Sequence, residues 1–214
     1  MKFFIILLIL SVLTGLYAED IQLPEPVLNS KVSVEQAIFQ RRSVRSYAEE
    51  ELTLNDVSQI LWSAQGITEK NRGYRAAPSA GAIFPLEVYI ASGNIEGLDK
   101  AVYRYDPKSH SLQKVFDGDI LEKLSGQGRM KTCACALVIT GVYERMEPRY
   151  KDRTQRYVHM EAGHAAQNVH LQVISLDLGT VLIGAFIDGQ VKQLLRLPEN
   201  EHPLYIMPIG RLKK

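Results

Sequence analysis

The spacing of apolar residues predicts two helices in the first third of the chain. Ser33 stands three residues before Gln36, which is the spacing of a capping box at a helix start, and Thr53 and Asp56 repeat the pattern. Apolar residues then recur at helical intervals, and Gly66 supplies an end for the second run. The predicted helices cover residues 34–41 and 54–65.

Shorter apolar runs between turn signals predict strands in the rest of the chain. A long run without Pro predicts a helix over residues 154–177, with Gly179 as its stop. Helices and mostly antiparallel strands are mixed without a steady βαβ rhythm, so we expect an α+β fold with a central sheet flanked by helices. The predicted strands cover residues 86–92, 102–105, 112–115, 134–142, 181–183 and 204–209, and two short helices cover residues 120–124 and 190–195.

The N-terminal segment differs from the rest in composition. Lys2 precedes an apolar run over residues 3–16, and small and acidic residues follow from Ala18. This order is typical of a secretory signal, and the run is shorter than the roughly 20 apolar residues that span a bilayer. We therefore expect an exported protein, periplasmic or extracellular, with an uncleaved membrane anchor as the alternative. The expected organisation is a signal peptide over residues 1–18, a linker over 19–31 and one domain over 32–214.

Charge and cysteine content exclude several classes of site. The 214 residues include 25 basic and 24 acidic side chains, so no overall charge favours binding to nucleic acid. Cys133 and Cys135 lie in an apolar stretch and would point to the same face of a strand, with Cα atoms near the outer distance limit for a disulfide and poorly directed Cβ atoms. We expect both to be buried thiols. No set of ligands at metal spacing accompanies them, so no metal site is expected.

A basic run stands where the first helix should end. If the chain becomes extended there, Arg41, Ser43 and Arg45 point to one side. Guanidinium groups with a hydroxyl between them offer charge-assisted, bidentate donors, so this run can bind a phosphate. The alternative is that the arginines only complement the dipole of the helix end.

Two further segments are rich in small residues. Residues 78–82, PSAGA, let a backbone approach a flat ligand closely, although alone they indicate a tight turn. In the long helix, Ala162, Gly163 and Ala166 would let another helix pack closely. His164 lies among them, and we interpret it as a core or interface residue and assign it no catalytic role.

These features, in this order, resemble the nitroreductase-like flavoproteins, and among them the azoline-dehydrogenase (SagB-type) branch. The similarity covers nearly all of residues 34–211. The motifs that carry it are RRSVR at 41–45, PSAGAIFPLEVY at 78–89, EAGHAAQN at 161–168 and DLGTVLIGAF at 177–186.

The resemblance implies an FMN bound at the interface of a homodimer, with the long helix at that interface. Arg41 and Ser43 are implied to bind its phosphate, and Arg211 would add a second charge. Arg42 would lie along the ribityl chain. Arg45 would reach the N1 and O2 edge of the ring, where negative charge develops on reduction. The remaining implied contacts are Pro78, Ser79, Ala80 and Gly81 against the FMN held mainly by the other subunit, Gly184 and Ala185 as backbone donors near N5, and Gln127 at the pyrimidine edge.

The resemblance further implies ping-pong oxidoreduction through flavin N5, with a nitro compound, quinone or heterocycle as the small substrate and NAD(P)H as a possible reductant. Azoline enzymes carry a Lys-Tyr pair before the long helix, and this chain has Arg149-Tyr150. Because arginine does not release its proton at ordinary pH, it is a poor substitute for a lysine base. The competing hypothesis is an exported flavin- or peptide-binding protein with this fold and little turnover.

Overall fold

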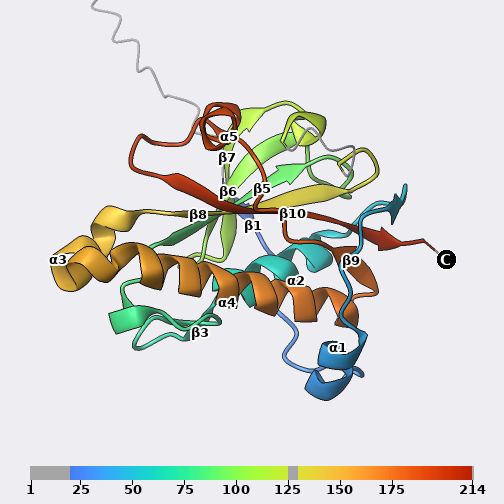
Figure 1. The fold of residues 1–214 in the computed structure, drawn as a ribbon. Helices are drawn as coiled ribbons and strands as arrows, with labels where there is room; N and C mark the ends of the chain where they lie inside the picture. The colour runs from blue at the N-terminus through green and yellow to red at the C-terminus, as the bar shows by residue number, and fades with distance from the viewer. Residues whose placement is uncertain (1–19, 125–129, 214) are drawn as a thin grey trace, which may run out of the picture.

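Antiparallel strands form the centre of the molecule. The computed structural model describes residues 20–124 and 130–213, and its main sheet has eight strands (Figure 1). They are β1 (Ile21–Gln22), β2 (Tyr47–Ala48), β5 (Leu86–Ser92), β6 (Ala101–Asp106), β7 (Ser111–Asp117), β8 (Cys135–Gly141), β9 (Leu178–Thr180) and β10 (His202–Leu212). Their order is β1-β7-β6-β5-β8-β10-β2, and β9 also pairs with β10. A separate hairpin consists of β3 (Ile67–Glu69) and β4 (Tyr74–Arg75).

Helices cover both faces of this sheet. The helices are α1 (Val34–Gln40), α2 (Leu54–Gln65), α3 (Glu147–Tyr150), α4 (Thr154–Ser175) and α5 (Asp188–Leu195), and short 3₁₀ turns occur at Ala80–Ala82, Leu121–Lys123, Tyr143–Arg145 and Lys151–Arg153. The long α4 and its neighbour α2 lie against one face, and α5 lies on the other (Figure 1). The α+β class expected from the sequence is therefore confirmed.

The core has one layer on each side of the sheet, and β5 shows why. Leu86, Val88 and Ile90 join the cluster under α2 and α4, whereas Tyr89 and Ala91 join the cluster on the α5 side. Successive side chains of a strand point to opposite faces, so a strand covered on both faces must be apolar throughout. This explains why the central strands β5 and β8 are mostly apolar in sequence.

The two capping boxes are confirmed. The Ser33 hydroxyl accepts a hydrogen bond from the Gln36 backbone at 3.2 Å, and the Gln36 side chain accepts one from the Ser33 backbone at 3.0 Å. Thr53 and Asp56 form the equivalent pair at the start of α2, and Gly66 caps its end. Backbone donors at these helix starts are thus satisfied locally.

The predicted end of the long helix is wrong. The chain leaves the helical conformation at Asp177, whose φ is 55°, and Gly179 lies inside β9. Gly179 is needed there for close packing, because a Cβ atom at this position would lie 2.8 Å from Val44. The strand expected over residues 181–183 is replaced by β9, and Ile183 forms an isolated bridge with Ile206.

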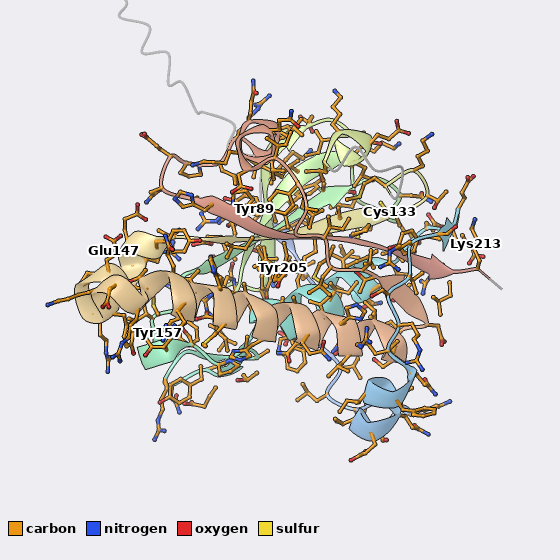
Figure 2. All side chains as sticks on the ribbon, viewed as in Figure 1. Tyr89, Cys133, Glu147, Tyr157, Tyr205 and Lys213 are labelled. Atoms are coloured by element: carbon orange, nitrogen blue, oxygen red, sulfur yellow. The ribbon has the colours of Figure 1, made fainter. Side chains whose placement is uncertain are left out.

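The cysteines are buried free thiols, as expected, but they do not share one face. Strand β8 begins at Cys135, whose side chain joins the cluster under α2 and α4. Cys133 precedes the strand and joins the cluster on the α5 side, where Figure 2 also places Tyr89. The strand alternation rule fails because Cys133 is outside the strand.

The first part of the segment predicted as a linker is packed onto the domain, whereas residues 27–31 are exposed. Ile21 pairs with Leu112 at the edge of the sheet, and Leu23 is buried. The Pro24 carbonyl accepts hydrogen bonds from Ser58 and His110. The predicted signal peptide, residues 1–18, lies outside the described residues. Within residues 20–124 and 130–213, no helix has the length and apolar character needed to cross a membrane.

Candidate functional site

The basic run after α1 is extended, which meets the condition for its arginines to act together. The Val44 backbone donates a hydrogen bond to the Thr180 carbonyl at 2.9 Å, and Ser43 forms a parallel bridge with Thr180. Val44 packs against the cluster on the α5 side of the sheet, while Ser43 and Arg45 are exposed and Arg41 is half-buried. The run therefore presents a hydroxyl and guanidinium groups outside the core.

Arg42 differs from the other arginines of this run. Its Nη1 donates hydrogen bonds to the carbonyls of Phe39 and Arg41, both at 2.8 Å. These carbonyls lie at the end of α1, so Arg42 performs the helix-end role that was the alternative interpretation of the run. Among the described residues, Arg41 and Arg45 form no salt bridge, and their charges remain available to a ligand.

Arg211 reaches the same edge through β9. Arg211, in β10, pairs with Leu178 in β9. Strand β9 ends at Thr180, which forms the bridge with Ser43. Arg211 Nη2 contacts the Asp56 carboxylate at 2.7 Å, and Asp56 is almost fully buried. Arg211 is therefore already paired, in contrast to Arg41 and Arg45.

Buried polar atoms without hydrogen-bond partners occur beside the basic run. They are the Thr180 hydroxyl and both ring nitrogens of His170. Burial and the Arg41 charge lower the pKa of His170, which favours the neutral ring. Such orphaned groups are costly unless a ligand or water binds them. The edge formed by residues 41–45 and Thr180 therefore fits a phosphate group. Among the described residues, it offers guanidinium groups without salt bridges, an exposed hydroxyl, and buried polar atoms without partners.

The segment bearing Gly184 and Ala185 follows β9 and Ile183. Both residues are exposed, and a Cβ atom on Gly184 would meet nothing closer than Tyr205, at 4.0 Å. The open space at Gly184 is compatible with the approach of a flat ring. Gln127, the remaining residue proposed for the pyrimidine edge, lies outside the described residues.

The turn at residues 78–82 has strained backbone geometry. Gly81, Ala82 and Phe84 have φ values of 65°, 54° and 54°. The Ser79 hydroxyl accepts a hydrogen bond from the Phe84 backbone at 2.9 Å, which holds the turn. Residues other than glycine rarely adopt such φ values, so Ala82 and Phe84 are strained. Strain of this kind is found most often at functional sites.

A pocket of about 520 Å³ opens beside this turn. Its lining includes Tyr74, Arg75, Pro78, Ser79, Phe84 and Arg149. A Cβ atom on Gly81 would lie 2.8 Å from Arg149 Nη1 and 2.8 Å from the Tyr150 hydroxyl, so Gly81 makes room for both. Tyr150 in turn packs edge-on against Tyr157, which Figure 2 places at the α3 end of α4.

Glu161 lies beneath the same turn, where the Ser79 hydroxyl acts on its carboxyl group, and the sequence indicates it only as the first residue of the EAGHAAQN motif. It is 2 % exposed, and neither carboxylate oxygen has a hydrogen-bond partner of good geometry among the described residues. Burial raises the pKa of Glu161 to about 7, against the opposing effects of the Ser79 hydroxyl and the Arg75 charge. The available signal was its position among the apolar residues of the helix, next to Ala162 and three residues after Val158.

Sequence reasoning did not single out Arg75. It lies in β4, and its Nη1 donates a hydrogen bond to Gln65 at 2.9 Å. The guanidinium also lies over the Phe84 ring, 4.7 Å from the centroid. No sequence motif predicts these two contacts of Arg75, because its hairpin meets α2 and the 78–82 turn only in the folded protein.

One protomer does not bring all the predicted residues together. The 78–82 turn lies toward the α3 end of α4, and the run after α1 lies at the other end (Figure 1). Their neighbours on α4 agree, since Glu161 faces the turn and His170 senses the Arg41 charge. Residues 41–45, 180 and 211 form one group, and residues 78–81 with Arg149 form another.

Comparison with known proteins agrees with the fold and with the motifs. The nitroreductase family profile matches residues 38–211. A protein of Methanocaldococcus jannaschii whose name assigns it to the nitroreductases is 41% identical over 196 residues, covering 90% of this chain and 96% of its own length. A crystal structure of a Ralstonia eutropha protein, also assigned to the nitroreductases, has a TM-score of 0.83 at 29% identity and covers 94% of this chain and 92% of its own.

The chain is also similar to McbC, the microcin B17-processing protein of Escherichia coli. The identity is 27% over 169 residues, covering 74% of this chain and 62% of that protein. With these relatives, the resemblance inferred from the four motifs is confirmed. The chain therefore belongs to the nitroreductase family and is an oxidoreductase.

Proposed function

We propose that this protein is a homodimeric, FMN-dependent oxidoreductase that acts on a small organic substrate such as a nitro compound, a quinone or a heterocycle. The observation that carries the proposal is the separation of two ligand-binding groups within one protomer. A flavin held at the run 41–45 would lie far from the 78–82 turn of its own chain. A second protomer that supplies its turn would complete the site.

The residues after α1 would bind and orient the cofactor. Arg41 and Ser43 would hold the phosphate, with the orphaned Thr180 hydroxyl and His170 close to them. Arg45, exposed and without a salt bridge, would extend toward the ring edge. Arg211 would add charge to the phosphate site only in part, because Asp56 neutralises it.

Bound FMN would supply reversible two-electron transfer, which allows one substrate to leave before the next enters, in ping-pong order. The protein's own contribution is position and exclusion of water. Phe84 and the strained turn would cover one side of the ring, and exposed backbone at Gly184 and Ala185 would face its other edge. No side chain of the described structure is required as a dedicated acid or base.

Exposed apolar side chains support the second protomer. Val34, Ile38 and Phe39 of α1 are 58–77% exposed, and Met160 projects from α4. Three large apolar side chains exposed on one short helix mark an interface more often than a free surface. The dimer proposed here would bury these side chains along α1 and α4.

Cellular location and electron donor follow from the expected signal peptide. Export would place the protein where nicotinamide cofactors are scarce, so we propose NAD(P)H only as a possible reductant. Oxidation of azolines is the less favoured reaction, because Arg149 occupies the place of the expected lysine.

The test begins with the colour of the purified protein. It should bind FMN, bleach anaerobically with NADH, NADPH or an organic donor, and regain its colour with a quinone or a nitroarene. Arg41→Ala combined with Ser43→Ala should lose FMN, whereas Arg72→Ala, on the exposed β3–β4 hairpin, should retain it. A yellow protein that never turns over would instead favour a flavin- or peptide-binding role, and a colourless monomer indifferent to FMN would overturn the proposal.

A further inference from the structure

The pocket beside the 78–82 turn carries two cations that form no salt bridge with a described residue. Arg75 is half-buried, and burial lowers its pKa while the charges of Glu87 and Glu161 oppose that effect. Its recorded hydrogen bond is to the neutral amide of Gln65. Neither Arg75 nor Arg149 forms a salt bridge with a carboxylate in the part of the chain that the structure describes.

The nearest carboxylates cannot fully compensate these charges. Glu87 is already held by Arg104 at 2.9 Å and by Arg145. Glu161 is buried behind the turn, and at neutral pH it is only partly ionised because burial raises its pKa to about 7. The pocket therefore keeps an excess of positive charge that favours an anion.

The shape and the aromatic lining limit the ligand further. Phe84 presents its ring beneath the Arg75 guanidinium, and Tyr74 lines the same pocket. The Arg149 guanidinium lies 5.5 Å from the Tyr150 ring centroid and beside Gly81. A guanidinium donates up to five N–H groups in one plane, which suits a carboxylate, and aromatic rings suit a planar body.

We propose that this pocket selects planar aromatic substrates that carry a carboxylate, with Arg149 and Arg75 as the residues that bind the negative group. The inference rests on the proposed flavin-dependent function and names its substrate class. Arg149 is exposed and Arg75 is half-buried, so the two guanidinium groups would bind the negative group from different depths of the pocket.

Direct binding tests this without requiring turnover. The purified full chain, loaded with FMN, is titrated with 4-nitrobenzoate and with 4-nitrobenzamide, an uncharged analogue of nearly the same shape, and binding is followed by calorimetry and by the flavin absorbance. The benzoate should bind at least about tenfold more tightly, the discrimination expected from one good charge-assisted contact. Arg149→Gln should reduce the preference to less than about threefold, and Arg149→Lys should restore part of it.

Arg72→Gln is the matched control, because Arg72 lies on the same hairpin as Arg75 and outside the pocket lining. It should keep the full preference. Equal affinity for the two probes in a yellow, reducible protein would overturn the inference and leave the proposed function standing. Loss of FMN from Arg149→Gln would also overturn it, since the cations would then serve the cofactor phosphate. A protein unable to hold FMN would overturn both.

Discussion

Glu161 offers a direct test of the electrostatics beneath the 78–82 turn. Its carboxyl has a pKa of about 7 in the folded protein and 4.5 when unperturbed. The folded protein therefore retains a proton that the unfolded chain releases at lower pH. Stability contributed at this position is fully present below pH 4.5, falls between pH 4.5 and 7, and stays low above pH 7.

The size of this effect follows from the shift. Each pKa unit corresponds to about 1.4 kcal/mol, so the difference between 4.5 and about 7 amounts to roughly 3 kcal/mol. Glu161→Gln keeps the shape of the protonated carboxyl and removes the ionisation. We expect this variant to be more stable than the wild type by about 3 kcal/mol at pH 8, with the advantage disappearing below about pH 4.5.

The measurement is urea unfolding of both proteins across this pH range, at one protein concentration and without added FMN, because dimerisation and ligand binding also change stability. The informative quantity is the difference between wild type and variant at each pH, since it cancels the contributions of other groups. Glu147→Gln, an exposed substitution on α3, should give a difference that does not vary with pH. Parallel curves for wild type and Glu161→Gln would refute the reasoning.

Three other outcomes are expected. Gly81→Ala should destabilise the protein by about 1 kcal/mol or more, because φ is 65° and the new methyl group would lie 2.8 Å from Arg149 and Tyr150. Urea unfolding measures the loss of stability, and titration with 4-nitrobenzoate measures any effect of displacing Arg149. Cys133 should react with a thiol reagent far more slowly in the folded protein than in urea, because burial raises its pKa to about 12, and rapid reaction of native protein would contradict this. Asp56→Ala should cost about 3–5 kcal/mol, since it removes a helix cap and leaves Arg211 unpaired, and a midpoint of thermal unfolding close to the wild-type value would show that the ion pair contributes little.

Structural features that depend on contacts between residues close in sequence could be predicted. Both capping boxes and the central strands were predicted because hydroxyl spacing and apolar runs are local signals. The stop of the long helix was misplaced because Gly179 serves contacts with Val44 and Leu212 from distant segments. Packing of that kind has no signature in a single sequence.

The candidate site was predicted only in part. Residues 41–45 were recognised as a candidate phosphate site from their composition, whereas the bridge between Ser43 and Thr180 was not predicted. The pairing of Arg211 with Asp56 and the deep position of Arg75 depend on contacts across more than a hundred residues or between separate elements, so no motif revealed them. The cofactor contacts themselves remain predictions.

The position of β10 has a consequence for how the protein is made. This strand lies between β8 and β2 in the sheet, and among the described strands it alone pairs with β9, yet it follows every other described element along the chain. A growing polypeptide can pair β5 with β6, β7 and β8, but β8 must keep an open edge until synthesis has almost finished. The edge that we propose binds the phosphate, which depends on β2, β9 and Arg211, would therefore assemble in the last step of folding.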